Sequence, residues 1–364
     1  MKVIAAVRAV RLDGDRARRT LLSPQRWVNE KAVGPTGRMA AGKLVRVVLA
    51  LLLLIQLGAC DFPFGRDPRA ATPVPTVSPA PVVEPTPAYS HPPEMGIPNK
   101  VLVGASYGAN SDPGEFEQKI GGTLQIRRTY WDGDKVDSAV RTASEDIAVG
   151  RIPWISFELP YSWAEMAAGQ GDDWTIDLIL KLAALKAPVW IAFHHEPEGD
   201  GDVRDWVAMQ RRLAPIVHAH SDNVAFSTIL TGWNQLYGEA QYSLDALYPG
   251  DGLIDIMGFD PYNEYGVVKD GMAITYPFDF GLPTLAAFAK SKKAAWGLAE
   301  TGYTDDAAMA DPRWLDRIYS ELSAHGAIAL TYFNTELNAY GSWLIDSPTK
   351  IKAFSNILKR AKEE

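Results

Sequence analysis

Two glutamates in this sequence are candidates for reactive groups, because each of them ends a short apolar run. Glu196 ends the run Pro188-Val-Trp-Ile-Ala-Phe-His-His-Glu196, in which a short apolar segment stops abruptly at two histidines and a carboxylate. Glu300 ends a second apolar run, Trp296-Gly-Leu-Ala-Glu300, and Thr-Gly-Tyr303 follows it. Two carboxyl groups in one cleft can supply a general acid and a nucleophile. They can do so only if the fold brings the two segments together.

The segments around these glutamates belong to a pattern that repeats eight times. Short apolar runs typical of buried parallel strands alternate with segments that have the spacing of amphipathic helices. This alternation over residues 99–364 predicts an α/β fold, a (β/α)8 TIM barrel. A doubly wound sheet is the alternative, but no G-x-G-x-x-G turn follows the first run. The expected strands are 101–105, 125–130, 153–157, 189–193, 224–229, 254–259, 295–299 and 327–333, and the expected helices are 135–149, 174–186, 203–221, 283–292, 311–324 and 350–362.

Polar residues follow several of the expected strands. Strand four ends at Glu196, strand six runs into Gly258-Phe-Asp-Pro-Tyr-Asn263, and strand seven ends at Glu300. Active sites of TIM barrels lie at the C-terminal ends of the strands, so both glutamates are expected in one cleft. Glycoside hydrolysis with retention needs two carboxyl groups about 5–5.5 Å apart. The placement of the two glutamates meets the topological part of that requirement.

Three motifs in residues 99–364 resemble glycoside hydrolase family 26. The family's acid/base follows a histidine, as Glu196 follows His195, and its nucleophile lies in a context similar to Ala299-Glu300-Thr-Gly302. The strand-six pattern Gly-x-Asp-x-Tyr is also present and ends at Tyr262. The resemblance implies a retaining endo-β-glycanase with Glu196 as acid/base and Glu300 as nucleophile. It also implies a hydrogen bond from Tyr262 to the nucleophile.

One departure from the family concerns the substrate. Mannanases of the family usually continue after His-Glu with Asn-Gly and a tryptophan, whereas Pro197-Glu198-Gly-Asp200 follows here. The expected substrate is a β-linked polysaccharide, with β-mannan as the first choice and mixed-linkage glucan or xylan as alternatives. Glu198 is the rival acid/base. A glycan-binding lipoprotein with a barrel cleft but no turnover is the alternative function.

Aromatic side chains are expected to bind the sugar rings, because such rings present apolar faces. The aromatic candidates, which follow strand ends, are Trp131, Trp233, Tyr303 and Trp343. His195 and Tyr262 are further expected substrate-binding residues. Each tryptophan could equally cap the core. The long connection 263–282 is a candidate for shaping subsites. No cofactor and no metal is expected, because His-His-Glu lacks the His-Glu-x-x-His spacing.

The N-terminal region predicts export. Lys43-Leu-Val-Arg46 precedes an apolar run at 47–57, and Leu57-Gly-Ala-Cys60 closes it in a way that resembles a bacterial lipobox. Residues 1–60 are therefore interpreted as an N-terminal extension and a lipoprotein signal peptide, with Met39 as a candidate start. Cys60 is the expected lipidation site, which would anchor the protein to the outer face of the cell membrane. A buried cysteine and a plain transmembrane anchor are the alternatives.

Residues 61–98 are rich in proline, threonine and alanine and predict a semi-extended linker without a core. The formal net charge of −8 and the lack of a basic stripe argue against nucleic-acid binding. The single cysteine excludes an intrachain disulfide. A monomer is expected.

Overall fold

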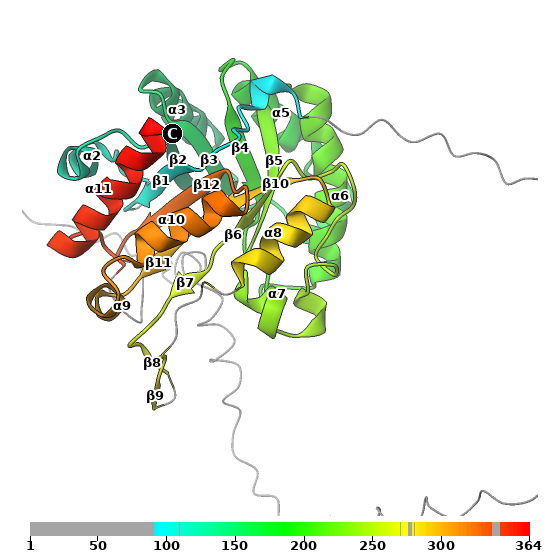
Figure 1. Ribbon diagram of the computed structural model, residues 1–364. Helices are drawn as coiled ribbons and strands as arrows, with labels where there is room; N and C mark the ends of the chain where they lie inside the picture. Colours follow the sequence, from blue (N-terminus) through cyan, green and yellow to red (C-terminus); the bar gives the residue numbers. More distant parts are fainter. Residues whose placement is uncertain (1–90, 109, 270, 276–278, 280, 337–342) are drawn as a thin grey trace, which may run out of the picture. The chain divides into compact units, whose positions relative to one another are not determined.

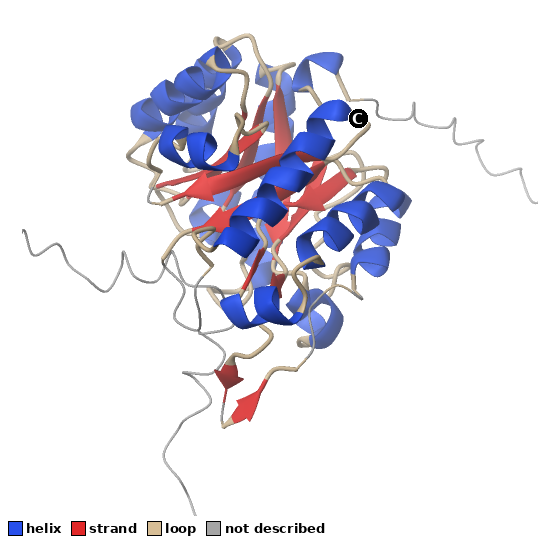
Figure 2. Cartoon of the chain, turned by 60° about the vertical axis from the view of Figure 1, so that its left-hand side comes forward, coloured by secondary structure: helices blue, strands red, loops and turns tan. Residues whose placement is uncertain are grey.

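The computed structural model describes residues 91–108, 110–269, 271–275, 279, 281–336 and 343–364. Cys60, the predicted signal segment and residues 61–90 of the predicted linker lie outside them. Within the described ranges, eight parallel strands form a closed barrel in the order β1-β12-β10-β6-β5-β4-β3-β2. Helices surround this barrel (Figures 1 and 2). The predicted (β/α)8 fold is confirmed.

All eight predicted strands are present, and their ends agree with the structure to within two residues. The barrel strands are β1 (Leu102–Tyr107), β2 (Ile126–Trp131), β3 (Ile152–Phe157), β4 (Val189–Phe193), β5 (Val224–Leu230), β6 (Ile256–Phe259), β10 (Ala295–Leu298) and β12 (Ala329–Asn334). We call the end of the barrel at which these strands finish the mouth, and the end at which they start the base.

The six predicted helices are also present, with ends that agree to within three residues. They are α3 (Val136–Ala148), α5 (Asp172–Ala183), α6 (Val203–His220), α8 (Leu282–Ser291), α10 (Trp314–Ala324) and α11 (Pro348–Glu363). Shorter helices that were not predicted are α2 (Gly114–Ile120), α4 (Trp163–Ala167), α7 (Trp233–Tyr237), α9 (Asp305–Ala310), η1 (Pro93–Met95) and η2 (Ala240–Tyr242). Within the described part of the chain, no helix combines the length and apolarity that a membrane crossing requires.

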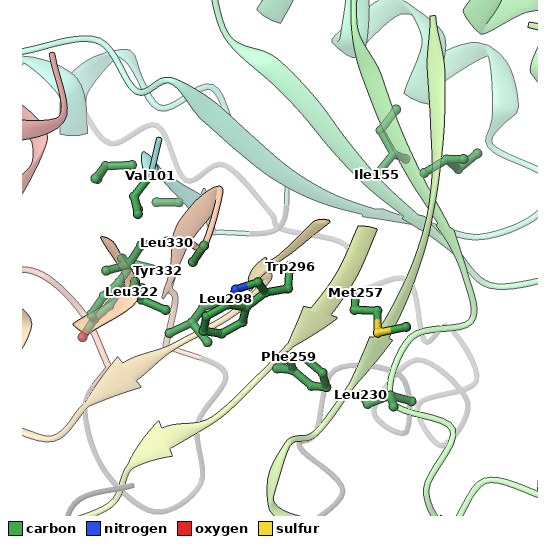
Figure 3. Close-up of a cluster of buried hydrophobic side chains, with 14 of the residues drawn as sticks. Val101, Ile155, Leu230, Met257, Phe259, Trp296, Leu298, Leu322, Leu330 and Tyr332 are labelled. Atoms are coloured by element: carbon green, nitrogen blue, oxygen red, sulfur yellow. The ribbon is translucent and has the colours of Figure 1, made fainter. Parts of the chain in front are cut away.

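Alternation along the strands separates two apolar layers. Outward-facing side chains of the strands pack against the helices, and Figure 3 shows part of this layer around Met257, Phe259, Trp296 and Leu298. Inward-facing side chains fill the barrel, where the rings of Trp154 and Trp190 meet edge to face with centroids 5.2 Å apart. Beyond this inner layer, the inward-facing side chains at the mouth form the next ring.

The described chain begins at the base of the barrel. Met95 is buried, and its carbonyl oxygen accepts a hydrogen bond of 3.0 Å from Nε1 of Trp190. Nδ1 of His91 lies 3.1 Å from Oδ1 of the buried Asp255, which precedes β6. The linker was predicted to extend to residue 98. These contacts make residues 91–98 part of the barrel domain.

The long connection after β6 forms a small hairpin. Two-residue strands β8 (Val268–Lys269) and β9 (Met272–Ala273) pair antiparallel and project from the barrel (Figures 1 and 2). Nζ of Lys269 binds the Glu264 carboxylate at 2.7 Å near the hairpin's start. Val268 and Met272 are 63% and 73% exposed. The role of this hairpin in shaping subsites stays a prediction.

Candidate active site

The turn after β4 holds Glu196 at the mouth. The backbone N–H of His194 donates to the carbonyl of Phe157 at 2.9 Å, and that of Glu196 donates to the carbonyl of Ile229 at 2.9 Å. The turn is therefore fixed to both neighbouring strands, β3 and β5. His194 and Glu196 have φ values of 53° and 50°, a left-handed conformation that is strained for side chains of this kind. Strain retained between two anchored strands is a common feature of functional sites.

Glu300 follows β10 and is held by two phenols. The hydroxyl of Tyr130 donates to Oε1 at 2.7 Å, and the hydroxyl of Tyr262 donates to Oε2 at 2.6 Å. The guanidinium of Arg128 lies 3.7 Å from Oε1. Glu300 is 5% exposed, so these donors replace water around its carboxylate. The hydrogen bond from Tyr262 is the one that the family resemblance implied.

Glu196 has the opposite environment. Within the described ranges, no side chain makes a hydrogen bond to its carboxyl group. Burial raises the pKa of Glu196 well above its usual value, and the nearby carboxyls of Asp260 and Glu300 raise that pKa further. Both effects favour the protonated form of Glu196. The two glutamates thus differ as an acid and a nucleophile must differ.

His195 directly precedes Glu196 in sequence and lies beside Glu300 in space. Its Nε2 is 3.9 Å from Oε1 of Glu300, and its ring is tilted against Tyr130 with centroids 5.4 Å apart. Burial lowers the pKa of His195 well below its usual value, and the charge of Arg128 lowers that pKa further. A neutral imidazole at this place can position the carboxylate or a sugar hydroxyl, as predicted for it.

Three residues of the site were missed from the sequence: Arg128, Tyr130 and Asp260. Arg128 and Tyr130 alternate along β2 so that both face inward, and Asp260 follows β6 directly. Asp260 is 2% exposed, and among the described residues neither of its carboxyl oxygens has a hydrogen-bond partner. Burial raises the pKa of Asp260 well above its usual value, Glu300 raises it further, and Arg128 opposes both. A charged residue inside an apolar strand was the signal that could have found Arg128.

Glu198, the rival acid/base, has a different position. It is 1% exposed, and its Oε1 accepts hydrogen bonds from the backbone N–H of Thr231 at 3.1 Å and from Nε2 of Gln235 at 2.5 Å. These bonds tie the turn after β4 to the segment after β5. The carboxyl of Glu198 therefore holds the turn in place, and Glu196 remains the better acid/base candidate.

The predicted aromatic platforms fall into three groups. Trp131 and Trp233 are half-buried at the mouth, after β2 and β5, and their sugar-binding role stays a prediction. Trp343 is 4% exposed and packs on the ring of Tyr262 with centroids 5.1 Å apart, so it supports the site from behind. Tyr303 was predicted wrongly. Its ring is fully buried against Trp314, because β11 (Gly302–Tyr303) pairs with β7 (Tyr262–Asn263) and turns that ring toward the helices.

Among the residues that the structure describes, no cluster of three His, Cys, Asp or Glu side chains is arranged to hold a metal ion. His194 instead pairs with Asp200, at 3.1 Å from Nε2 to Oδ2, and packs edge to face on Trp163. His194 and His195 therefore point to different partners. The chemistry that this site offers is that of two carboxyl groups with unequal proton affinity.

Comparisons with known proteins yield structural relatives only. The sequence matches no family model and no curated protein. It is similar in structure to BoMan26A, a GH26 beta-mannanase from Bacteroides ovatus, with 14% identity, coverage of 74% of this chain and 91% of that chain, and a TM-score of 0.52. It is also similar to Cel5A of Thermotoga maritima in complex with mannotriose, with 12% identity, coverage of 74% and 99%, and a TM-score of 0.51. These likenesses establish the barrel fold.

Proposed function

We propose that this protein is a retaining endo-β-glycanase, with Glu300 as nucleophile and Glu196 as acid/base. The observation that carries the proposal is the contrast between the two carboxyls. Glu300 accepts two phenolic hydrogen bonds beside a guanidinium, which favours the charged form that a nucleophile needs. Glu196 has a raised pKa, which favours the protonated form that a general acid needs.

The proposed reaction has two steps. In the first, a carboxylate oxygen of Glu300 bonds to the anomeric carbon while the proton of Glu196 passes to the departing glycosidic oxygen. In the second, Glu196 takes a proton from water, the water oxygen bonds to the anomeric carbon, and the bond to Glu300 breaks. The negative charge moves from Glu300 to Glu196 and back. The net charge of the buried site is therefore constant through the cycle.

The proposed substrate is a β-linked polysaccharide, with β-mannan first and mixed-linkage glucan or xylan as alternatives. The resemblance to glycoside hydrolase family 26 supports β-mannan, as does the structural likeness to a beta-mannanase. The likeness to Cel5A, whose structures include complexes with mannotriose and cellobiose, supports the wider range. The different turn after Glu196 leaves the choice of sugar to experiment.

A panel of mannan, mixed-linkage glucan and xylan, hydrolysed in an NMR tube, tests the proposal. The expected first product is the β-anomer, seen before mutarotation, together with a rapid fall in viscosity that marks endo action. An α-anomer as first product would overturn the retaining mechanism. Glycan binding without any product would favour the alternative, a binding protein that does not turn over its ligand.

We further propose that Cys60 is lipidated and anchors the protein to the outer face of the cell membrane. The support is the sequence Leu57-Gly-Ala-Cys60 after an apolar run. Cys60→Ser is expected to release the protein from the membrane fraction or leave the signal uncut, as judged by fractionation and N-terminal mass spectrometry. A mature wild-type N-terminus at any other residue would contradict the proposal.

A further inference from the structure

The two carboxylate oxygens of Glu300 are not equivalent. Oε1 accepts from Tyr130 at 2.7 Å, and both Arg128, at 3.7 Å, and His195, at 3.9 Å, approach the same oxygen. Oε2 accepts only from Tyr262, at 2.6 Å, among the contacts of the described residues. Three protein groups therefore lie around Oε1, whereas one hydroxyl approaches Oε2, so Oε2 has the less crowded surroundings.

We propose that Oε2 of Glu300 is the attacking oxygen and that Tyr130 is a positioning residue that holds Oε1 through both steps. This inference rests on the proposed function and deepens it. Tyr130 lies on β2, across the barrel from β10 and far from the motifs that first indicated the site. Its part in the reaction is to fix which oxygen of the nucleophile faces the sugar.

Tyr130 is itself held firmly. Asn110 accepts a hydrogen bond from the backbone N–H of Tyr130 at 2.9 Å and donates one to its carbonyl oxygen. The guanidinium of Arg128 lies 4.8 Å from the centre of the Tyr130 ring, and Phe333 meets the ring edge on at 6.1 Å. A phenol fixed on its backbone and on both sides of its ring can orient a carboxylate with little motion.

The role of Tyr130 differs between the two steps. While the bond from Oε2 to the anomeric carbon forms, Oε1 loses charge and becomes the carbonyl oxygen of the glycosyl ester. When water displaces the ester, the electron pair of the breaking bond returns to Oε2 and the charge spreads again to Oε1. The hydrogen bond from Tyr130 to Oε1 therefore directs the attack in the first step and stabilises the departing carboxylate in the second.

Tyr130→Phe in the full chain tests this inference, and Tyr107→Phe is its matched control. Tyr107 ends the neighbouring strand β1 and stacks on Phe116, away from Glu300. The first measurement needs no substrate: the ¹³C signal of the Glu300 carboxyl is recorded at fixed pH and assigned with Glu300→Gln. Because a hydrogen bond changes the electron density of the carboxyl group that accepts it, the chemical shift should change in Tyr130→Phe and stay in place in Tyr107→Phe.

The second measurement is turnover of 2,4-dinitrophenyl β-mannobioside and β-cellobioside, whose leaving group departs without acid help. Loss of a hydrogen bond to a charged group is expected to lower kcat roughly 10–100-fold in Tyr130→Phe. If the wild type turns over, an unchanged Glu300 chemical shift or an unchanged kcat in Tyr130→Phe would overturn the role of Tyr130 alone. A wild type that hydrolyses no glycan would remove the role of Tyr130 together with the proposed function.

Discussion

Two adjacent arginines on β2 belong to two very different charge clusters. Arg127 faces the helices, where its Nη1 binds Asp146 at 3.0 Å; Arg151 binds the same Asp146 at 2.9 Å and Glu117 at 2.6 Å. This outer cluster has two guanidiniums for two carboxylates. Arg128 faces the barrel interior, where it lies 3.7 Å from Glu300 and its charge lowers the pKa of Asp260 against the effect of burial. Alternation along one strand thus separates a balanced cluster from an acidic one.

The difference shows what each cluster is for. The outer cluster joins β2, α2 and α3 by ion pairs, and its two arginines oppose the rise in the pKa of Asp146 that burial causes. Among the described residues, the inner cluster of Glu300, Glu196 and Asp260 has one guanidinium for three carboxyls. Burial and repulsion between the carboxyls raise the pKa values of Glu196 and Asp260 well above their usual values. The proposed acid/base chemistry needs a group that can hold a proton, and the shortage of cations in the inner cluster favours it.

Removing the nucleophile should have the largest effect on activity. Glu300→Ala is expected to lower kcat roughly 10⁴–10⁶-fold on polysaccharides and on aryl glycosides alike, as loss of a nucleophile does elsewhere. Azide should restore turnover and give the α-glycosyl azide, because it attacks from the face that Glu300 occupied. A β-glycosyl azide from this variant would reverse the roles of the two glutamates.

Removing the acid should have the next largest effect, and it should depend on the leaving group. Glu196→Ala is expected to slow polysaccharide hydrolysis about 10²–10⁴-fold and to spare most of the first step on a dinitrophenyl glycoside. Added azide should give the β-glycosyl azide. Glu198→Gln is the matched control, since its amide oxygen can still accept from Thr231. Full activity of the Glu196 variant would exclude that residue as acid/base.

Asp260→Asn tests how the inner cluster sets the pKa of Glu196, because it removes one of the three carboxyls of that cluster. Burial raises the pKa of Glu196 first and the charge of Asp260 raises it second, so that pKa should fall in the variant at any pH at which Asp260 of the wild type is ionised. The basic limb of kcat/KM should then move to lower pH. The shift is measured in a pH–rate profile on a polysaccharide substrate, whose leaving group needs a proton from the acid. An unmoved basic limb would mean that Asp260 does not affect Glu196.

The same variant should change stability with pH. The pKa of Asp260 is raised in the folded protein, so the folded state keeps a proton that the unfolded state loses above about pH 4. The contribution of Asp260 to stability therefore falls as pH rises, so the wild type should lose more stability than the asparagine variant. The Tm of Asp260→Asn should exceed the wild-type Tm at pH 7 and approach it at pH 4.

Breaking the balanced cluster should have the smallest effect on activity. Asp146→Asn removes the carboxylate that pairs with both Arg127 and Arg151. It is expected to lower the free energy of unfolding by about 3–5 kcal/mol. kcat measured well below the Tm should be unchanged. Asp137→Asn, which breaks an exposed pair with Lys181, should leave the urea midpoint unchanged. Loss of activity in folded Asp146→Asn would show that the two clusters are coupled.

The fold and the catalytic pair could be predicted because their signals are local. A buried parallel strand is a continuous apolar run, and Glu196 and Glu300 directly follow such runs. Asp260 also follows such a run, within Gly258-Phe-Asp-Pro-Tyr-Asn263, but Arg128 and Tyr130 lie inside a strand and act through contacts with residues far away in the sequence. The oxygen of Tyr130 meets a carboxylate 170 positions further along the chain.

Tyr303 shows a second limit of reading the sequence. A residue just past a strand end can face the cleft or the helices, and the direction depends on how the chain continues. Here β11 pairs with β7 beyond the barrel, and Tyr332 and Trp314 enclose the Tyr303 ring. Strand-end position predicted the neighbourhood of Tyr303 correctly and the direction of its side chain wrongly.

The entry of the chain at the base has a mechanical consequence. Residues 91–98 are fastened there by the buried Met95 and by the contact of His91 with Asp255, at the end opposite to Glu196 and Glu300. A force applied at residue 91 would act on the first residues of the barrel strands and leave the mouth undisturbed. Coupling the protein to a bead or a chip through this residue would therefore keep its cleft facing the solution.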